Sequence, residues 1–456
     1  MIILIEYNFP DLSYLLSPKS VAFIGASIDT NTIGGRVLIN LQKSHYKGKI
    51  YPVHPEYNEI FGIRTYPNLM SIPEQVDTVV IIAAARSVVP LLNECEEKKV
   101  KFIVLLTCFA EPAEDHRVLE KTLRAFSDGT GIRILGSNSY GLFNINEPFG
   151  ISSSLFYEPN RLQKGRISVI TVDGGLGRTV LDAADRGIGF NYWISTGNES
   201  DLEVADFIKY MAYDSSTQVI FALVEGIKDK QKFRNAAKAA NRAGKPLLLF
   251  NIGNPETGVE DNQAGIISTA DINELIDVGW LFVTHGIPAG NRIGIFAYSP
   301  GIKTLLANKC RLANLTVLDL TNKTKVLLQE LAPEFGMASN PIHLTSSIFQ
   351  NLGVFREYLE IFANDPNLDV VFVPFPYKLG TYTEMMVRQT IEVAKRMNKP
   401  IIPLWTSLSG ELETSFEILI DSQLPFYRTA DACILAVKHF TDYYLNRSVL
   451  MKKNIL

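Results

Sequence analysis

Short apolar runs rich in β-branched residues alternate with helical stretches along most of this 456-residue chain. Strands of a parallel sheet that is covered on both faces read as nearly continuous hydrophobic runs. The first 140 residues contain five such runs, namely Val21–Gly25, Ile50–Val53, Thr78–Ala83, Phe102–Leu106 and Ile132–Leu135. Helical patterns, for example 88–98 and 116–126, separate them. The sequence therefore predicts a doubly wound α/β domain at the start of the chain.

Two further α/β series follow the first. The second has predicted strands at Ile167–Val172, Tyr192–Ser195, Val219–Val224, Leu247–Phe250 and Leu281–Thr284, and helices at Gly177–Asp185, Leu202–Tyr213 and Lys230–Ala243. The third has predicted strands at Ile293–Ala297, Thr316–Leu318, Val370–Pro374 and Ile401–Leu404. Polar or Gly/Pro-bearing stretches at 149–164 and 286–291 mark the boundaries. We therefore expect three domains, at residues 10–148, 160–286 and 290–446.

Composition excludes several classes of protein. The chain is 46% hydrophobic and 20% charged with a net charge of -4, which is the profile of an ordinary globular protein without a basic stripe for nucleic acid. The longest apolar stretch, 79–85, ends at Arg86 and is far shorter than the ~20 residues of a membrane span. The first six residues lack the basic region of a signal peptide. We expect a cytoplasmic protein with no membrane or nucleic-acid partner.

The cysteines argue in the same direction. No Cys-x-x-Cys pair occurs among the four, which are Cys95, Cys108, Cys310 and Cys433. Such spacing favours reduced thiols and neither a disulfide framework nor a cysteine metal site. The sequence also contains no readable cluster of metal ligands, so no metal is expected.

One turn of the first domain could bind phosphate. The predicted strand from Val21 runs into Gly25-Ala26-Ser27, and Gly34-Gly35 precedes a helix expected from about Arg36. Backbone N–H groups at the start of such a helix can hold a phosphate. The fragment is neither Gly-x-Gly-x-x-Gly nor Gly-x-x-x-x-Gly-Lys-Ser/Thr, so by itself it fits a purely structural turn equally well.

A series of motifs in fixed order adds a family resemblance. The motifs lie at 17–27, 48–55, 136–142, 187–190, 195–198, 224–226, 340–345 and 424–427. In this order they resemble the α subunit, or α-type half, of NDP-forming acyl-CoA synthetases, which are relatives of succinyl-CoA synthetase. The resemblance covers nearly the whole chain. It implies a Rossmann-like CoA-binding domain followed by two flavodoxin-like domains of the succinyl-CoA synthetase type.

The resemblance also implies where CoA binds. The phosphates of CoA or acyl-CoA would lie near Gly25, Ala26 and Ser27. Arg36, Lys43 and Arg86 are candidate cations for them, because Lys and Arg pair readily with phosphate. His54 and Asn138, each in a matching motif, would line the same cleft. For each cation a solvated surface charge is the competing interpretation, and for His54 it is an ordinary loop histidine.

The chain departs from the family at the residue that carries phosphate. In the family, a histidine on a mobile loop takes phosphate from an acyl phosphate and passes it to NDP on an ATP-grasp module. No histidine lies between His116 and His285 here. The corresponding loop, 251–269, instead contains Gln263 and the acidic residues Glu256, Glu260 and Asp261. Acidic side chains repel phosphate, so we expect the phosphohistidine step to be absent.

The two helix starts that cradle the phosphohistidine in the family are also altered. Asp173, in the segment 171–177, is expected at a helix N-cap, where its carboxylate satisfies the N–H groups itself. The second cradle, 297–301, has fewer glycines than the family pattern. Glu225, a partner of the histidine in the family, is present. His343 stands where the family has an aspartate and is our candidate replacement, although a lone histidine is more often structural.

Three functions therefore stay open. The chain could be an acid–CoA ligase whose phosphoryl path is rerouted through a separate ATP-grasp β-type subunit, since no nucleotide site is readable here. It could be an acyl or carbamoyl transferase. It could also be a non-catalytic CoA-binding protein. Glu225, Asp173 and His343 are the candidate catalytic residues. A homo- or hetero-oligomer is expected, because subunit interfaces of this kind commonly close symmetrically.

Overall fold

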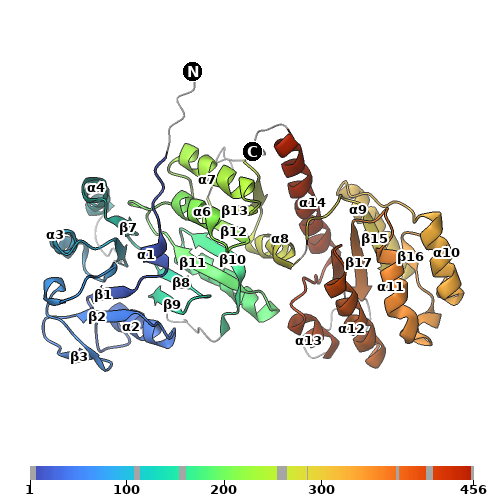
Figure 1. The fold of residues 1–456 in the computed structure, drawn as a ribbon, viewed down its shortest axis with the longest axis horizontal. Helices are drawn as coiled ribbons and strands as arrows, with labels where there is room; N and C mark the ends of the chain where they lie inside the picture. Colours follow the sequence, from blue (N-terminus) through green and yellow to red (C-terminus); the bar gives the residue numbers. More distant parts are fainter. Residues whose placement is uncertain are drawn as a thin grey trace, which may run out of the picture. The chain divides into compact units, whose positions relative to one another are not determined.

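The chain divides into two compact units. The first comprises Met1–Asp185 with Gly189–Ser268, and the second comprises Arg186–Ile188 with Thr269–Leu456. The computed structural model describes residues 7–106, 113–153, 161–253, 264–284, 286–375, 379–406 and 414–452. Figure 1 shows the α/β elements of both units. Among the described residues, no helix combines the length and the apolar composition that a bilayer span requires.

The first unit begins with a parallel sheet. Its strand order is β2-β1-β5-β6-β7, with bounds β1 (Ser20–Ile24), β2 (Lys49–Val53), β5 (Thr78–Ile81), β6 (Phe102–Leu105) and β7 (Arg133–Leu135). The accompanying elements are α1 (Ser13–Leu16), α2 (Ile33–Lys43), β3 (Glu59–Ile60), β4 (Ile63–Arg64), α3 (Val88–Glu97) and α4 (Ala113–Thr130). All five predicted strands are confirmed. The strand order reverses between β1 and β5, and ligands of open α/β sheets bind outside the carboxyl ends at such a point.

A second, mixed sheet belongs to the same unit. Its order is β14-β13-β12-β10-β11-β8-β9. The bounds are β8 (Gly141–Asn144), β9 (Phe149–Ser152), β10 (Lys164–Thr171), β11 (Phe190–Ser195), β12 (Val219–Val224), β13 (Leu247–Asn251) and β14 (Ile266–Thr269), with α5 (Gly174–Val180), α6 (Val204–Tyr213) and α7 (Lys230–Arg242). β8 and β9 form an antiparallel hairpin that extends the parallel strands.

The second unit contains a smaller parallel sheet of order β16-β15-β17-β18. The strands are β15 (Ile293–Ala297), β16 (Ile342–His343), β17 (Val370–Phe375) and β18 (Ile401–Trp405). The helices are α8 (Ile272–Thr284), α9 (Pro300–Leu312), α10 (Asn322–Leu331), α11 (Phe355–Ala363), α12 (Thr381–Arg396), α13 (Thr414–Asp421) and α14 (Ala430–Lys452).

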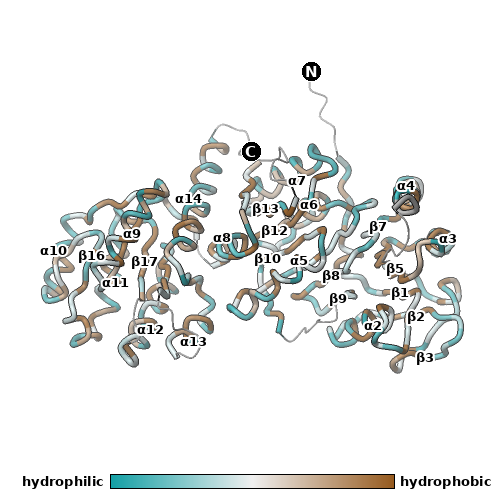
Figure 2. Tube along the Cα trace, turned by 180° about the vertical axis from the view of Figure 1, so that it is seen from behind, coloured by the Kyte–Doolittle hydropathy of each residue, from teal (hydrophilic) through white to brown (hydrophobic). Residues whose placement is uncertain are grey.

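The strands supply the cores of both units. Every residue of β1, β5, β12 and β17 is buried. In Figure 2 hydrophobic residues follow β17, whereas hydrophobic and hydrophilic residues alternate along α10. Full burial of one Val, Ile, Leu or Phe side chain contributes about 1.5–3 kcal/mol. The continuous apolar runs therefore both identify the strands and hold the layers together.

Two predicted strands are wrong. Leu281–Thr284 is the last turn of α8, which packs along α14. Residues on several sides of α8 are buried, and a short apolar run does not by itself separate a buried helix from a strand. Thr316–Leu318 makes only an isolated bridge, between Thr316 and Arg292. The helix expected from about Arg36 begins earlier, at Ile33, so that Gly34 and Gly35 lie inside its first turn.

The sheets also cross the domain boundaries expected from the sequence. β8 lies within the range 10–148, yet it pairs with β11 of the second sheet. The helix α8 lies within 160–286, yet it belongs to the second unit. As limits of independently folding domains, the ranges 10–148, 160–286 and 290–446 stay a prediction.

Candidate functional site

The carboxyl end of β1 presents bare backbone. Gly25 directly follows β1, is exposed and has a φ of +86°, which favours glycine. A Cβ atom at this position would lie 2.1 Å from the carbonyl oxygen of Ile82. A larger residue at position 25 would therefore clash with the backbone at Ile82 and cover the turn.

The start of α2 closes tightly over the same turn. Cβ atoms at Gly34 and Gly35 would each lie 2.1 Å from a carbonyl oxygen, those of Gly25 and Asp29 respectively. The Thr32 hydroxyl caps the helix by accepting the Gly35 N–H at 3.2 Å. In dinucleotide-binding folds, glycines at such positions let the backbone approach a pyrophosphate at the helix start. The residues present fit a CoA phosphate by this criterion.

The structure places the three predicted cations differently. Arg36 lies in the first turns of α2, where its Nε donates to the carbonyl oxygen of Ser153 at 3.3 Å and its Nη1 donates to that of Asn31. Arg86 is exposed in the turn that follows β5, at the carboxyl edge. Lys43 is the last residue of α2, about 15 Å along the helix from Ile33 at 1.5 Å per residue. Lys43 therefore lies at the opposite end of α2 from the Gly25 turn, and its contact with the phosphates stays a prediction.

His54 and Asn138 lie at the same edge but on opposite sides of β1. His54 follows β2, and its ring stacks on Tyr57 at 4.3 Å between centroids. Its Nδ1 accepts the Glu56 N–H at 3.2 Å, so local contacts already use this ring. Asn138 is exposed after β7, three strands from β1, which corresponds to about 14 Å at the usual strand spacing. Ala26 is buried and Ser27 is half-buried beside Gly25.

A connection of only five residues, Gly136 to Tyr140, leads from β7 of the first sheet to β8 of the second. Because β8 runs antiparallel to β11, it starts at the carboxyl end of β11. The Ser139 hydroxyl donates to the carbonyl oxygen of Ser195 at 2.6 Å, and the Tyr140 N–H donates to the Ser195 hydroxyl at 3.2 Å. The connection therefore brings the carboxyl edges of the two sheets together.

Two predicted catalytic residues lie at this edge of the second sheet. Asp173 and Glu225 each stand two residues beyond a paired position, Thr171 of β10 and Leu223 of β12. Asp173 is the N-cap of α5, and its Oδ1 accepts the Leu176 N–H at 2.5 Å, as expected. Glu225 is exposed. Two carboxylates thus face the same edge.

An aromatic ring covers the start of α5. A Cβ at Gly174, the first residue of that helix, would lie 2.1 Å from Cγ of Tyr140. The ring therefore occupies the space over the helix start that a side chain would otherwise fill. Sequence reasoning did not single out Tyr140, since nothing in its motif announces contact with α5.

His343 lies in the second unit and is half-buried in β16, where it pairs with Ala297. The geometry thus leaves its catalytic role a prediction. In the altered second cradle, the Ser299 hydroxyl caps α9 by accepting the Ile302 N–H at 3.5 Å. The loop residues Glu256, Glu260, Asp261 and Gln263 lie outside the described residues. Among the residues that the structure describes, no group of His, Cys, Asp and Glu is arranged to hold a metal ion.

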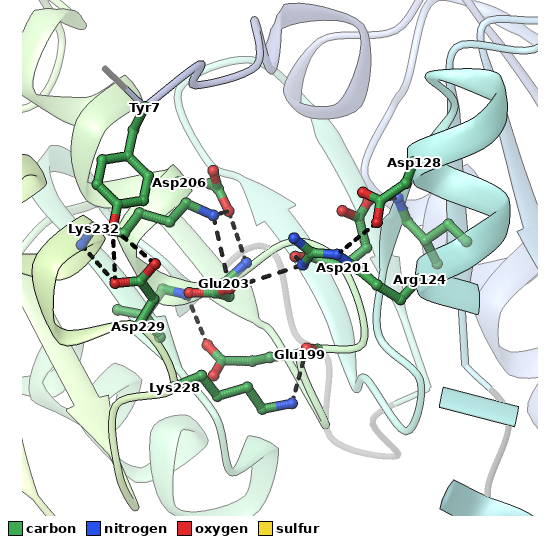
Figure 3. A network of polar contacts seen from close by, with 12 residues as sticks. Tyr7, Arg124, Asp128, Glu199, Asp201, Glu203, Asp206, Lys228, Asp229 and Lys232 are labelled. Atoms are coloured by element: carbon green, nitrogen blue, oxygen red, sulfur yellow. Dashed lines mark hydrogen bonds and ion pairs between the residues drawn. The ribbon is translucent and has the colours of Figure 1, made fainter. Parts of the chain in front are cut away.

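A buried carboxyl group near this edge was also missed. Glu199 follows β11, has a φ of +52° and is 7% exposed. Its Oε1 accepts the Val204 N–H at 2.7 Å, while the Lys228 ammonium donates to the Glu199 backbone carbonyl at 2.9 Å (Figure 3). Burial raises the pKa of Glu199 to about 7, with the hydrogen bond from Val204 and the charge of Lys228 opposing that effect. A glutamate in a polar loop gives no sequence signal of burial.

Two carboxylates near Glu199, those of Asp206 and Asp201, form ion pairs with basic side chains. Asp206 accepts from the Lys232 ammonium at 2.7 Å (Figure 3), and Asp201 makes a bidentate pair with Arg133, with a shortest distance of 2.7 Å. An open pocket of about 560 Å³ lies beside this network. Lys101, Phe102 and Arg133 of its lining stand at the amino ends of β6 and β7, which is the edge opposite Gly25.

Comparisons with known proteins agree with this arrangement. Residues 19–144 match a CoA binding domain, and residues 164–274 match a succinyl-CoA ligase like flavodoxin domain. The α subunit of acetate–CoA ligase (ADP-forming) II from Pyrococcus furiosus is 28% identical over 442 residues, which cover 91% of this chain and 94% of that protein. Acetate–CoA ligase (ADP-forming) from Methanocaldococcus jannaschii is 30% identical over 73% of this chain. The chain spans about half, 49%, of that longer relative.

Solved structures show the same fold. A crystal structure from Pyrococcus horikoshii OT3 has a TM-score of 0.83 and 26% identity, covering 96% of this chain and 99% of that one. The dinucleotide forming acetyl-coenzyme A synthetase 1 of Ca. Korarchaeum cryptofilum has a TM-score of 0.87 at 22% identity, covering 97% and 99%. Fold and matches together define a protein of the succinyl-CoA synthetase-like superfamily with a CoA-binding domain. Within it, this chain belongs to the α-type chains of the NDP-forming acyl-CoA synthetases.

Proposed function

We propose that the chain binds CoA or acyl-CoA at the Gly25 turn and supports acid–CoA ligase-type acyl transfer between the two sheets, without a phosphohistidine. One observation carries the proposal. The five-residue connection from Gly136 to Tyr140 joins the carboxyl edge of the CoA-binding sheet to that of the ligase-like sheet. A CoA whose phosphates lie at Gly25 could thus extend its thiol along this edge toward Glu225.

The start of α5 supports a route without the phosphohistidine. The Asp173 carboxylate accepts the Leu176 N–H, which would otherwise be free for an anion. A second negative charge at this position would be repelled by Asp173, and the Tyr140 ring covers the adjacent Gly174. The sequence offers no histidine between His116 and His285 as an acceptor.

The proposed chemistry is transfer of an acyl group between phosphate and sulfur. The CoA sulfur attacks the carbonyl carbon of an acyl phosphate, the C–S bond forms, and the C–O bond to the leaving phosphate breaks. The thiol proton must leave, and the exposed carboxylate of Glu225 is the acceptor we propose. Formation of the acyl phosphate from a nucleotide would need a partner of the ATP-grasp type. A relative named as an α subunit, and relatives roughly twice as long, support such a partner.

Calorimetric titration with CoA tests the binding site. We expect a 1:1 isotherm for the wild-type chain and an affinity at least about tenfold lower for Gly25→Ala, because the Cβ would displace the turn. Gly62→Ala is the matched control, since Gly62 also has a positive φ (+79°) but has no neighbouring atom within 4 Å of its Cβ position. Lys43→Ala, at the far end of α2, should bind CoA as the wild type does.

A folding check accompanies this titration, because Gly25→Ala could unfold the first sheet. Arg86→Gln removes an exposed charge at the carboxyl edge without touching the core, and we expect a several-fold loss of affinity. Absence of any heat with CoA, in a chain shown to be folded, would contradict the proposal. Binding of CoA without turnover of acyl phosphate, alone or with an ATP-grasp partner, would instead show a non-catalytic CoA-binding protein.

A further inference from the structure

We propose that Tyr140 sets the size of the acyl group that this chain accepts, its ring forming a fixed wall at the junction of the two sheets. The inference rests on the proposed function, because it concerns the acyl end of the same ligand. It assigns a specificity-determining role and no part in bond making.

The ring and the helix start fit each other closely. The Cβ position of Gly174 lies 2.1 Å from Cγ, 2.3 Å from Cδ2 and 2.5 Å from Cβ of Tyr140. Glycine at position 174 therefore makes room for this ring, and any side chain there would displace it. Such a pair behaves as one packed unit, since two groups in direct contact do not vary independently.

The backbone of Tyr140 is held on both sides. Its N–H donates to the Ser195 hydroxyl at 3.2 Å, and its carbonyl oxygen accepts the Ser153 N–H at 3.3 Å. The Ser153 carbonyl in turn accepts from Nε of Arg36 at 3.3 Å. A chain of contacts thus runs from the start of α2, through Tyr140, to the start of α5. A ring on such a fixed backbone, packed against Gly174, restricts the space beside it.

The position of Tyr140 meets the expected path of the ligand. It stands two residues after Asn138, at the carboxyl edge of the first sheet, and touches the residue that follows Asp173 at the carboxyl edge of the second. Tyr140 is nevertheless 43% exposed, so it remains accessible to a ligand. An acyl chain that extends past the carbonyl carbon would meet this ring, whereas an acetyl group would not reach as far.

Removal of the ring should therefore change discrimination more than CoA affinity. Each methylene buried in the freed space favours binding by about fourfold in Kd, from about 0.8 kcal/mol per CH₂. Hexanoyl-CoA has four methylenes more than acetyl-CoA. If only two of them occupy the space in Tyr140→Ala, the ratio of the two dissociation constants should shift by about tenfold or more.

The test measures Kd for CoA, acetyl-CoA and hexanoyl-CoA by calorimetry. We expect the wild type and Tyr140→Phe to bind acetyl-CoA more tightly than hexanoyl-CoA, and Tyr140→Ala to lose or reverse this preference. Affinity for CoA itself should stay within about twofold. Tyr213→Ala is the matched control, since Tyr213 is 70% exposed at the end of α6 and should leave all three affinities unchanged.

A second replacement distinguishes loss of the Tyr140 ring from a general loosening of the site. Tyr140→Leu places a shorter apolar side chain where the ring lay, and it should restore part of the preference for acetyl-CoA. The inference is overturned if folded Tyr140→Ala binds CoA and shows the wild-type ratio of acetyl-CoA to hexanoyl-CoA. A different result, in which no variant binds CoA, overturns the proposed function and this inference with it.

Discussion

Replacement of Glu199 by glutamine should make the chain more stable in alkaline solution than in acid, relative to the wild type. The Glu199 carboxyl is buried and accepts one N–H, from Val204, at 2.7 Å. The ammonium of Lys228 contacts the backbone carbonyl of Glu199 and thus compensates the carboxylate only partly. Burial raises the pKa of this group from 4.5 to about 7. Glutamine keeps an oxygen for the Val204 N–H and carries no charge to bury.

The sign follows from linkage. The folded chain holds the Glu199 proton up to about pH 7, whereas the unfolded chain releases it near 4.5. The stabilisation from this proton is complete below the unfolded pKa and is lost as the pH rises through the folded pKa. The two pKa values differ by about 2.5, and 1.36 kcal/mol per pKa difference of one gives about 3 kcal/mol. Glu199→Gln lacks this term.

Urea unfolding of both proteins at about pH 4.5 and about pH 8.5 measures the effect. The difference in free energy of unfolding, Glu199→Gln minus wild type, should grow by about 2–3 kcal/mol between the two pH values. A fixed offset from the extra N–H₂ group of glutamine cancels in this comparison. Glu96→Gln, an exposed carboxylate on α3, should show no such growth. A pH-independent difference for Glu199→Gln would refute the reasoning.

Three further variants test other parts of the structure. Asp201→Ala should destabilise the first unit by about 3 kcal/mol in urea unfolding, because it leaves the partly buried Arg133 without its bidentate partner; a loss under about 1 kcal/mol would show that the pair is dispensable. Asn340→Ala, whose buried amide bonds three backbone groups of the second unit, should lower stability by about 2–3 kcal/mol, and an unchanged urea midpoint would contradict this. Asp173→Ser keeps an N-cap for Leu176 at a cost below about 0.5 kcal/mol. In that variant millimolar phosphate should raise Tm more than it does in the wild type; equal shifts in both proteins would show that the Asp173 carboxylate does not exclude phosphate.

The sequence predicts the layers of the fold well, because strands buried on both faces must be apolar throughout. The prediction of strands fails where a run of residues is apolar for a reason other than burial in a sheet. The segment Leu281–Thr284 is apolar because α8 is buried against α14. The segment Thr316–Leu318 pairs with its neighbour only through the isolated bridge between Thr316 and Arg292. Periodicity over four residues does not distinguish these cases. The hairpin β8–β9 was missed for a different reason: the pairing of β8 with β11 is a contact between segments far apart in sequence, which a local pattern does not report.

For the candidate site, the sequence motifs identified Gly25 and Asp173 but not Tyr140 or Glu199. Gly25 and Asp173 take the conformations that their residue types favour, a positive φ and an N-cap. Lys43 was selected by charge alone, and a helix of eleven residues carries it away from the turn. Tyr140 and Glu199 depend on contacts between segments far apart in sequence, which no local pattern reports.

The hairpin β8–β9 also has a consequence for how the chain comes apart. Its first strand completes the sheet of β11, while its second strand packs against α2 of the first sheet. The Asn40 side chain of α2 donates to the carbonyl oxygen of Ser152 at 3.1 Å. A gene fragment that stops before Gly141 would strip α2 of this cover, and one that starts after Ser152 would expose the edge of β11 to aggregation. Because the β8–β9 hairpin contacts both sheets, neither sheet can unfold without disturbing the other. Heat should therefore unfold the first unit in one cooperative transition, with both sheets lost together.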